Sequence, residues 1–309
     1  KKLIKYQGTK QVFNFSSEAD CFINITFNED NNTENTIQYY QQACEKFNSK
    51  ICAFIRNDKL YSIEAGDTIE DGDELLFICK EENIEDITKL FGHNKNNRRI
   101  MIAGGGNIGK HLSENIRESY QVKVIESNEE RAEYLSEILD NVTIINADSS
   151  NEDILLEENI EHMDVFCALT NDDEANILSA MLAKKLGSKT VISIINKISY
   201  SDLLEKQEID ITVSPEDLTM GALLTHVRKG SVLKVHSLMR GNLELLELEV
   251  RDKENSKTIG KNLEQINTPE NTIMCCIIRD EIIIFDMTNI LLEKSDRLVC
   301  FVNKKDVKQ

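Results

Sequence analysis

One stretch of the sequence decides the fold prediction: Ile100-Met101-Ile102-Ala103-Gly104-Gly105-Gly106-Asn107-Ile108-Gly109. Four apolar residues typical of a buried strand run directly into a Gly-x-Gly-x-x-Gly turn that opens a helix-like segment. In a dinucleotide-binding turn, Gly104 would form the tight bend, Gly106 would let the backbone approach a pyrophosphate, and Gly109 would let helix and strand pack closely. The amides at the start of the helix would then face an anion.

Glu126 supports this interpretation. It ends the next apolar run, 122–125, and lies about 20 residues beyond the glycine turn. A carboxylate there can accept hydrogen bonds from the ribose hydroxyls of adenosine and disfavours a 2′-phosphate. The residues therefore predict an adenosine nucleotide such as NAD(H), ADP or ATP rather than NADP. The alternative is the same fold with an empty or vestigial site.

The pattern after Arg98 predicts an α/β fold. Short apolar runs alternate with helical patterns, which is typical of a doubly wound, Rossmann-like parallel sheet with helices on both faces. The clearest helix, 173–186, ends before Gly187, and a second begins at Pro215 and ends near Gly230. We expect strands at 99–103, 122–126, 142–146, 164–169, 190–195 and 210–213.

A small α+β module follows Gly230, and the start of the chain repeats it. Residues 52–58 match 275–281, and residues 70–76 match 293–299, both at an offset of 223. A constant offset indicates an internal duplication. We expect three domains, at 1–92, 98–230 and 231–309. The second module follows a nucleotide-binding pattern, whereas the first module has none before it. This predicts that the chain is a fragment that lacks a first nucleotide-binding domain. In the second module we expect a short helix around Lys261 and strands at 232–238, 244–250, 273–278, 282–286 and 297–302.

Composition excludes several classes of protein. The formal charge of the 309 residues is -18, which argues against binding to nucleic acid or to an anionic lipid surface. The apolar runs are strand-sized, well short of the roughly 18 residues of a spanning helix. The eight cysteines include no C-x-x-C pair and the five histidines show no ligand spacing, so we predict a reduced cytosolic protein without a metal site.

Three stretches together resemble a known family: 99–109, 169–184 and 223–229. They are similar to the TrkA family of bacterial Trk potassium-uptake regulatory proteins, which carry two tandem RCK (KTN) units. Each unit has a Rossmann-like N-subdomain and a smaller C-subdomain. The resemblance implies that this chain is the first C-subdomain plus the complete second unit, lacking the first Rossmann N-subdomain.

The resemblance implies a regulator and not an enzyme. It implies a cytoplasmic homo-oligomer, a dimer or ring of RCK units, that is peripheral to the inner membrane. Its partner would be a membrane potassium-translocating subunit of the Trk type, gated in response to NAD(H), ADP or ATP. Neither nucleic acid nor lipid is an expected partner.

The resemblance also assigns site residues. The pyrophosphate would be lined by Gly104, Gly106, Asn107, Ile108 and Gly109, with Glu126 holding the ribose. The adenine would lie at Asp148 and Ser149 after the third strand, where a simple turn is the alternative. After the fourth strand, Thr170 and Asp172 would lie near the ligand, although helix capping is equally compatible with these residue types.

One departure from the family narrows the expected ligand. Many members carry an arginine near the end of the fifth strand that can meet a terminal phosphate. Here Asn196 and Lys197 stand in that place, and lysine lacks the planar fork of arginine. This favours NAD(H) or ADP over ATP.

Two other functions remain open from sequence. An NAD-dependent oxidoreductase would share the glycine turn, but it needs a proton donor facing the nicotinamide. The small modules offer no recognisable histidine or lysine constellation for that role. The other is a structural adaptor with a vestigial nucleotide site.

Overall fold

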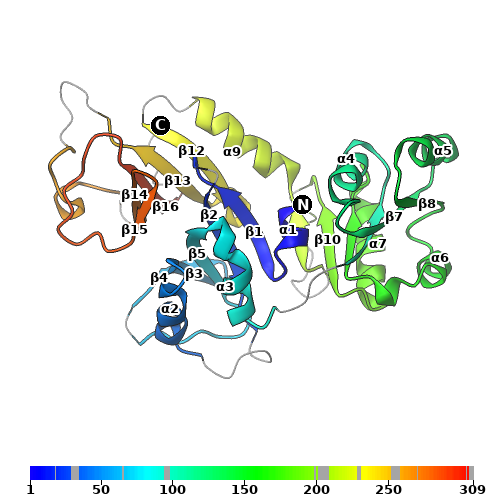
Figure 1. The fold of residues 1–309 in the computed structure, drawn as a ribbon, viewed down its shortest axis with the longest axis horizontal. Coiled ribbons are helices and arrows are strands. Elements are labelled where there is room, and N and C mark those ends of the chain that lie inside the picture. Colours follow the sequence, from blue (N-terminus) through cyan, green and yellow to red (C-terminus); the bar gives the residue numbers. More distant parts are fainter. Residues whose placement is uncertain are drawn as a thin grey trace. The chain divides into compact units, whose positions relative to one another are not determined.

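The computed structural model describes residues 1–17, 19–28, 35–64, 66–93, 98–197, 200, 209–227, 231–251, 258–269, 271–303 and 305. The chain forms two compact units (Figure 1). One combines Lys1–Gln7 with Lys95–Glu216, and the other combines Gly8–Asn94 with Asp217–Gln309. We call them the parallel unit and the repeat unit. The predicted domain boundaries between 92 and 98 and at 230 touch segments outside the described residues, so they stay predictions.

The parallel unit has the doubly wound fold that the sequence predicts. Six parallel strands lie in the order β11-β10-β9-β6-β7-β8, the order of a Rossmann sheet. The strands are β6 (Arg99–Ala103), β7 (Gln121–Glu126), β8 (Val142–Asn146), β9 (Val165–Ala168), β10 (Thr190–Ile194) and β11 (Ile211–Val213). The helices described between β6 and β10 are α4 (Asn107–Ile116), α5 (Glu129–Ile138), α6 (Glu152–Glu157) and α7 (Asp173–Lys185), with a short 3₁₀ turn at Ile160–His162.

Alternation along the strands produces two cores, one on each face of this sheet. Ile100 and Ile102 of β6 pack on one face with residues of α4 and α5, such as Ile116 and Leu135. The intervening Met101 and Ala103 pack on the other face, with residues of α6 and α7 such as Leu155, Ala180 and Ala183. Because successive strand residues point to opposite faces, one apolar strand serves both cores.

The N-terminal residues also belong to the parallel unit. Helix α1 (Lys2–Lys5) buries Ile4 in the core that contains Ile100. The sequence-based division placed these residues with the first module. Four residues carry too little periodicity to reveal such packing.

The repeat unit contains two antiparallel sheets of identical topology. Their strand orders are β1-β2-β5-β3-β4 and β12-β13-β16-β14-β15. The first repeat, 9–90, comprises β1 (Thr9–Asn14), β2 (Asp20–Thr26), α2 (Ile37–Glu45), β3 (Lys50–Arg56), β4 (Lys59–Ser62), β5 (Glu74–Lys80), a 3₁₀ turn (Glu81–Asn83) and α3 (Ile84–Leu90). The second, 232–303, follows α9 (Pro215–Val227) and comprises β12 (Val232–Leu238), 3₁₀ turn η4 (Met239–Gly241), β13 (Leu243–Glu249), 3₁₀ turn η5 (Leu263–Gln265), β14 (Ile273–Arg279), β15 (Ile282–Ile284) and β16 (Arg297–Asn303).

The duplication extends to every strand of the repeats. β1 begins at Thr9 and β12 at Val232, and the same difference of 223 residues separates the starts of the other four strand pairs. Where the first repeat has helix α2, the second has only η5, so the helix expected around Lys261 is a single turn.

An arginine fork around a buried aspartate is repeated with the strands. Arg56 donates to both carboxylate oxygens of Asp73, at 2.9 and 2.6 Å, and to the Thr68 carbonyl at 2.9 Å. In the second repeat, Arg279 donates to both oxygens of Asp296, at 2.7 and 2.8 Å. In each repeat the arginine of the third strand therefore holds the loop that contains the duplicated block, 70–76 in the first and 293–299 in the second.

The two repeats share one hydrophobic core within their unit. It joins side chains such as Phe22 and Leu76 of the first repeat to Leu245 and Phe301 of the second. Phe22 meets Phe301 edge to face, with ring centroids 5.9 Å apart. All eight cysteine side chains are buried in this or other cores, and burial raises the pKa of Cys44, Cys167 and Cys300 to about 12.

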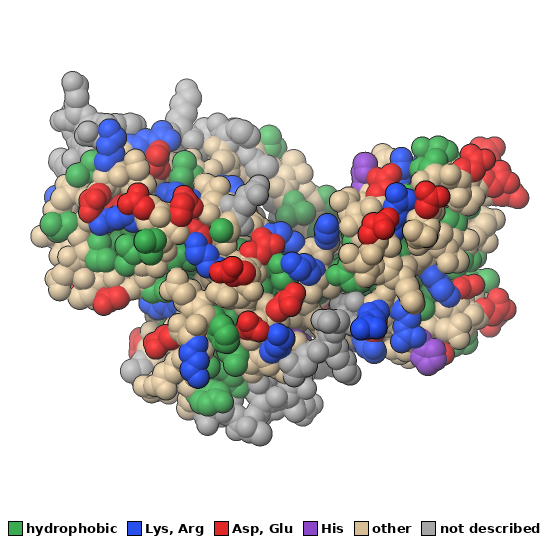
Figure 2. Space-filling model, in the orientation of Figure 1, with side chains coloured by type: hydrophobic (Ala, Val, Ile, Leu, Met, Phe, Trp, Pro, Cys, Tyr) green, Lys and Arg blue, Asp and Glu red, His purple; other side chains and the backbone are tan. Residues whose placement is uncertain are grey.

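Surface charge is mixed in sign. Figure 2 shows acidic and basic side chains interspersed over the visible face of both units. None of the described helices is both long and apolar enough to span a bilayer.

Candidate functional site

The carboxyl ends of three neighbouring strands meet at the glycine turn. The Gly104 amide donates to the Ile125 carbonyl at the end of β7, and the Leu169 amide beyond β9 donates to Ala103 of β6, both at 2.8 Å. The strand order reverses between β6 and β9. The turn therefore lies at the switch point where open parallel sheets bind their ligands.

Two glycines of the turn are required by the chain itself. Gly104 has φ +103°, and a Cβ there would lie 2.9 Å from the backbone nitrogen of Thr170. A Cβ on Gly109 would lie only 1.9 Å from the Gly104 carbonyl oxygen. A side chain at either position would force backbone atoms apart, so these glycines allow the tight bend and the close approach of α4.

Gly106 differs from Gly104 and Gly109. Its φ of −62° suits any residue, and apart from the adjoining backbone no described protein atom lies within 4 Å of the place its Cβ would take. Asn107 and Ile108, which follow it in the first turn of α4, are exposed. Nothing in the described chain requires glycine here, and a side chain would occupy open space in front of the helix start.

Glu126 is held against the same turn. Its Oε2 accepts from the Gly105 amide at 2.7 Å, and its Oε1 accepts from the Asn128 amide at 2.9 Å. Each oxygen has two lone pairs, so each can accept a further hydrogen bond. The backbone thus fixes the carboxylate against Gly105 without exhausting its acceptor capacity.

Arg131, on the first turn of α5, is a residue that sequence reasoning missed. Its Nε donates to the Gly105 carbonyl at 2.9 Å. Its guanidinium lies 5.1 Å from the centre of the Tyr134 ring, and the Lys110 ammonium lies 5.6 Å from the same ring. The rim of the turn therefore carries two cations. The sequence signal for it is the capping residue Asn128, which accepts from the Arg131 amide and so fixes Arg131 in the first turn of α5.

Asp148 and Ser149 stand after β8, at the same edge of the sheet. β8 pairs with β7 in parallel, and at its end the Asn146 side chain donates to the Glu126 carbonyl at 2.9 Å. Asp148 accepts from the hydroxyl and the amide of Ser150, at 2.6 and 2.9 Å, and both bonds lower its pKa. Asp148 therefore forms the local turn, while Ser149 is half-buried beside it.

Thr170 and Asp172 shape the loop between β9 and α7. Asp172 accepts from the Ala175 amide at 2.9 Å and so caps α7. Thr170 donates from its amide and its hydroxyl to Oδ1 of Asn176, at 2.8 and 2.7 Å. Asn176 is fully buried and its Nδ2 donates to the Ile194 carbonyl at 3.1 Å. This asparagine, which sequence reasoning did not single out, ties the loop to the end of β10.

Asn196 and Lys197, which stand where many family members carry an arginine, already have partners on α7. Asn196 and Lys197 donate through their backbone amides to the buried carboxylate of Asp173, at 2.9 and 2.8 Å. Burial alone would raise the pKa of Asp173, but these bonds outweigh it and the pKa is lowered. The Lys197 ammonium lies 3.3 Å from Glu174. In this arrangement Lys197 faces a carboxylate on α7.

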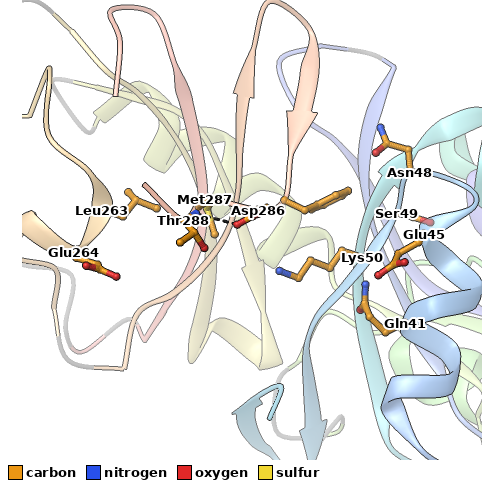
Figure 3. A pocket seen from close by; sticks show the side chains of 11 residues that line it. Gln41, Glu45, Asn48, Ser49, Lys50, Leu263, Glu264, Asp286, Met287 and Thr288 are labelled. Atoms are coloured by element: carbon orange, nitrogen blue, oxygen red, sulfur yellow. Dashed lines mark hydrogen bonds between the residues drawn. The ribbon is translucent and has the colours of Figure 1, made fainter. Parts of the chain in front are cut away.

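A separate cavity of about 630 Å³ lies in the repeat unit (Figure 3). The Lys50 ammonium reaches toward Asp286 of the other repeat, whose pKa is lowered by hydrogen bonds from Thr288 and then by Lys50. Glu45 and Glu264 add two further carboxylates to its lining. Three carboxylates against one ammonium disfavour a polyphosphate, so this cavity does not compete with the glycine turn as a nucleotide site.

Comparison with known proteins identifies the family. Residues 100–215 match the TrkA-N domain. The Trk system potassium uptake protein TrkA of Halomonas elongata is 36% identical over 99% of this chain and 67% of its own length. The TrkA proteins of Vibrio alginolyticus and Haemophilus influenzae are 36% and 33% identical, over 68% and 67% of their lengths. The chain thus spans about two thirds of these relatives.

Solved structures agree on the fold. The crystal structure of the GsuK RCK domain has a TM-score of 0.55 at 15% identity, covering 98% of this chain and 66% of that one. A GsuK channel bound to NAD has a TM-score of 0.55 at 14% identity, covering 99% and 55%. At this identity the likeness shows the RCK fold. Together with the sequence identities above, it places this chain in the TrkA family of Trk system potassium uptake proteins.

Proposed function

We propose that the chain is a nucleotide-binding regulatory subunit of a Trk-type potassium uptake system and has no catalytic activity of its own. The observation that carries the proposal is Gly106. Glycine is needed there neither for backbone conformation nor for packing within the described chain. It leaves room in front of the exposed start of α4, where amides suit a pyrophosphate.

The ligand that fits this room is an adenosine nucleotide without a 2′-phosphate. The first-turn amides at Gly106, Asn107 and Ile108 would hold the pyrophosphate, and Glu126 would accept from the ribose hydroxyls with its remaining lone pairs. Gly104 and Gly109 would act by keeping the turn closed. We favour NAD(H) or ADP over ATP, because the Lys197 ammonium, which could meet a terminal phosphate, is engaged by Glu174.

The remaining site residues would act at the edges of the ligand. Asp148 and Ser149 lie beyond β8 on the side of Glu126, where the adenine would lie. On the side of β9, Thr170 and Asp172 form the loop next to Gly104. Since Asp148, Thr170 and Asp172 already hold their loops by hydrogen bonds, their contribution would be to position backbone around the nucleotide.

Regulation requires the ligand to prefer one state of an assembly over another. We propose a homo-oligomer, a dimer or ring of RCK units, that is cytoplasmic and joins the inner membrane through a potassium-translocating subunit. Support comes from the relatives named as Trk system potassium uptake proteins and from the RCK fold shared with the GsuK channel.

Calorimetric titration of the chain with NADH, NAD, ADP, ATP and NADP tests the ligand. We expect heat with at least one of the first four and at least about tenfold weaker binding of NADP, because Glu126 would repel its 2′-phosphate. In Glu126→Gln this discrimination should shrink. No heat with any nucleotide would overturn the ligand proposal.

Potassium flux through the reconstituted membrane subunit tests the regulatory role. We expect addition of the chain to make flux depend on the nucleotide that binds. Flux indifferent to that nucleotide would point to an adaptor, and steady hydride transfer to a small substrate would point to an oxidoreductase. Either result would contradict the proposal.

A further inference from the structure

The contact between the two repeats is asymmetric in its polar groups. Residues 14–17, which comprise the end of β1 and the turn after it in the first repeat, receive polar side chains of the second. Lys234 donates to the carbonyls of Asn14 and Phe15, at 3.0 and 2.6 Å. Glu247 accepts from both the amide and the hydroxyl of Ser16, each at 2.8 Å. We call these the turn contacts, together with the hydrogen bond between Ser17 and Glu281, which lowers the pKa of Glu281.

Glu247 makes these contacts from a buried position. Its side chain is 0% exposed, and its second oxygen accepts from Arg297 at 3.2 Å. Arg297 in turn donates to Glu281 at 2.9 Å, and Lys80 of the first repeat donates to the Glu281 carbonyl at 3.1 Å. A buried carboxylate is stable only while its donors are present, since removing one leaves its desolvation uncompensated.

The duplication shows what stands at the equivalent positions of the first repeat. Subtracting the offset of 223 places Gln11 opposite Lys234 and Asn24 opposite Glu247. Asn24 donates to Glu74 of its own repeat at 2.9 Å, and Glu74 accepts from Lys10 at the same distance. The first repeat therefore carries neutral amides where the second carries an ammonium and a carboxylate.

The receiving segment differs as well. The residue of the second repeat that corresponds to Ser16 is Met239, whose side chain has no donor. If two second repeats paired, each buried Glu247 would lose the serine hydroxyl. If two first repeats paired, neutral amides would replace the charged groups, and hydrogen bonds of neutral groups are about half as strong.

We propose that the turn contacts make repeat pairing selective: the first repeat binds the second repeat of the chain and is disfavoured from pairing with a copy of itself. Shape alone would not give this selectivity, because both repeats have the same strand order and contribute apolar residues to one core. The polar asymmetry supplies the difference, and it is independent of any nucleotide.

The position of Phe13 provides a reporter. Its ring stacks on His236, with centroids 4.5 Å apart and planes 9° from parallel, and His236 is its equivalent in the second repeat. Equivalent residues that touch lie on the pseudo-twofold axis of the pair. Position 13 therefore faces β12 when unlike repeats pair, and would face β1 of another chain when like repeats pair.

Photocrosslinking of the full chain tests the proposal. Chains with benzoylphenylalanine at position 13, mixed as ¹⁴N and ¹⁵N forms, are denatured, refolded together and irradiated, and crosslinked peptides are identified by mass. We expect wild-type crosslinks to reach β12. In Lys234→Gln/Glu247→Asn, which installs the residues of the first repeat, we expect the ratio of β1–β1 to β1–β12 crosslinks to rise by at least about tenfold.

The matched control is Glu74→Gln, which disrupts a carboxylate network inside the first repeat and leaves the turn contacts intact. Its crosslink ratio should equal that of wild type. If the double variant does not refold, Lys234→Gln alone should shift the ratio in the same direction, because Lys234 is half-buried. An unchanged ratio in the variants, or an equal rise in the control, would overturn the proposal.

Discussion

The glycine turn of the parallel unit and the polar groups of the repeat unit differ in one respect: whether contacts within the chain require the residue type found at each position. In the repeat unit, the buried carboxylates Asp73, Glu247 and Asp296 each have an arginine partner within the chain. In the turn, Gly109 is explained by packing, whereas Gly106 faces open space. A residue that the chain itself explains should affect stability when it is changed. A residue that it does not explain should affect what binds from outside.

The largest effect should come from Gly109→Ala. The new Cβ would lie 1.9 Å from the Gly104 carbonyl oxygen, so α4 must move away from the turn. We expect the free energy of unfolding of the parallel unit to fall by about 3 kcal/mol, measured by urea denaturation. Gly106→Ala is the matched control, since it adds the same methyl group in open space. Equal losses in both variants would remove the distinction between the two glycines.

The next effect should come from the arginine forks, which sharpen the comparison within the repeat unit. Asp73→Asn and Asp296→Asn each replace a carboxylate that accepts two charged hydrogen bonds. We expect each variant to lose about 2 kcal/mol of unfolding free energy in urea denaturation, and the two losses to agree. Clearly unequal losses would mean that the repeats share geometry without sharing energetics. Nucleotide affinity should not change in either variant.

The sequence predicts the parallel sheet well because its strands are continuous apolar runs bounded by glycine or polar residues. It also predicts the repeats, since the offset of 223 survives in short blocks such as 52–58. Capping by Asp172 and the turn at Asp148 were open alternatives, and they are local enough to be anticipated from residue type. Their contact with a ligand stays a prediction.

Residues that act at a distance were not predictable. Asn176 lies within an ordinary helical pattern, and its bond to Ile194 exists only because β10 lies beside α7. Arg131 meets the Gly105 carbonyl across 26 positions of sequence. The helix expected around Lys261 is a single turn, which no local pattern distinguished from α2 of the first repeat.

Gly106→Ala tests whether the open space beside Gly106 is where the nucleotide binds. We expect nucleotide affinity in calorimetry to fall by about tenfold or more, because the methyl group would occupy the space where the pyrophosphate approaches. Unfolding free energy should change by less than about 1 kcal/mol, since alanine is only a poorer helix cap than glycine. Asp296→Asn serves as the affinity control. Unchanged nucleotide binding in Gly106→Ala would mean that the turn is not the ligand site.

The smallest effect should be a pH dependence at Asp173, a buried carboxylate at the start of α7. Its folded-state pKa is lowered by hydrogen bonds from Asn196 and Lys197 against the effect of burial. The unfolded chain therefore binds more protons, so this contribution to stability is present above the unfolded-state pKa of about 3.9 and is lost as pH falls through the folded value. Asp173→Asn should be less stable than wild type near neutral pH, and the difference should shrink below about pH 4. Urea denaturation across this range measures it, with the exposed Asp153→Asn as control. A difference that stays constant with pH would show that the amide disrupts packing and that the charge of Asp173 contributes nothing.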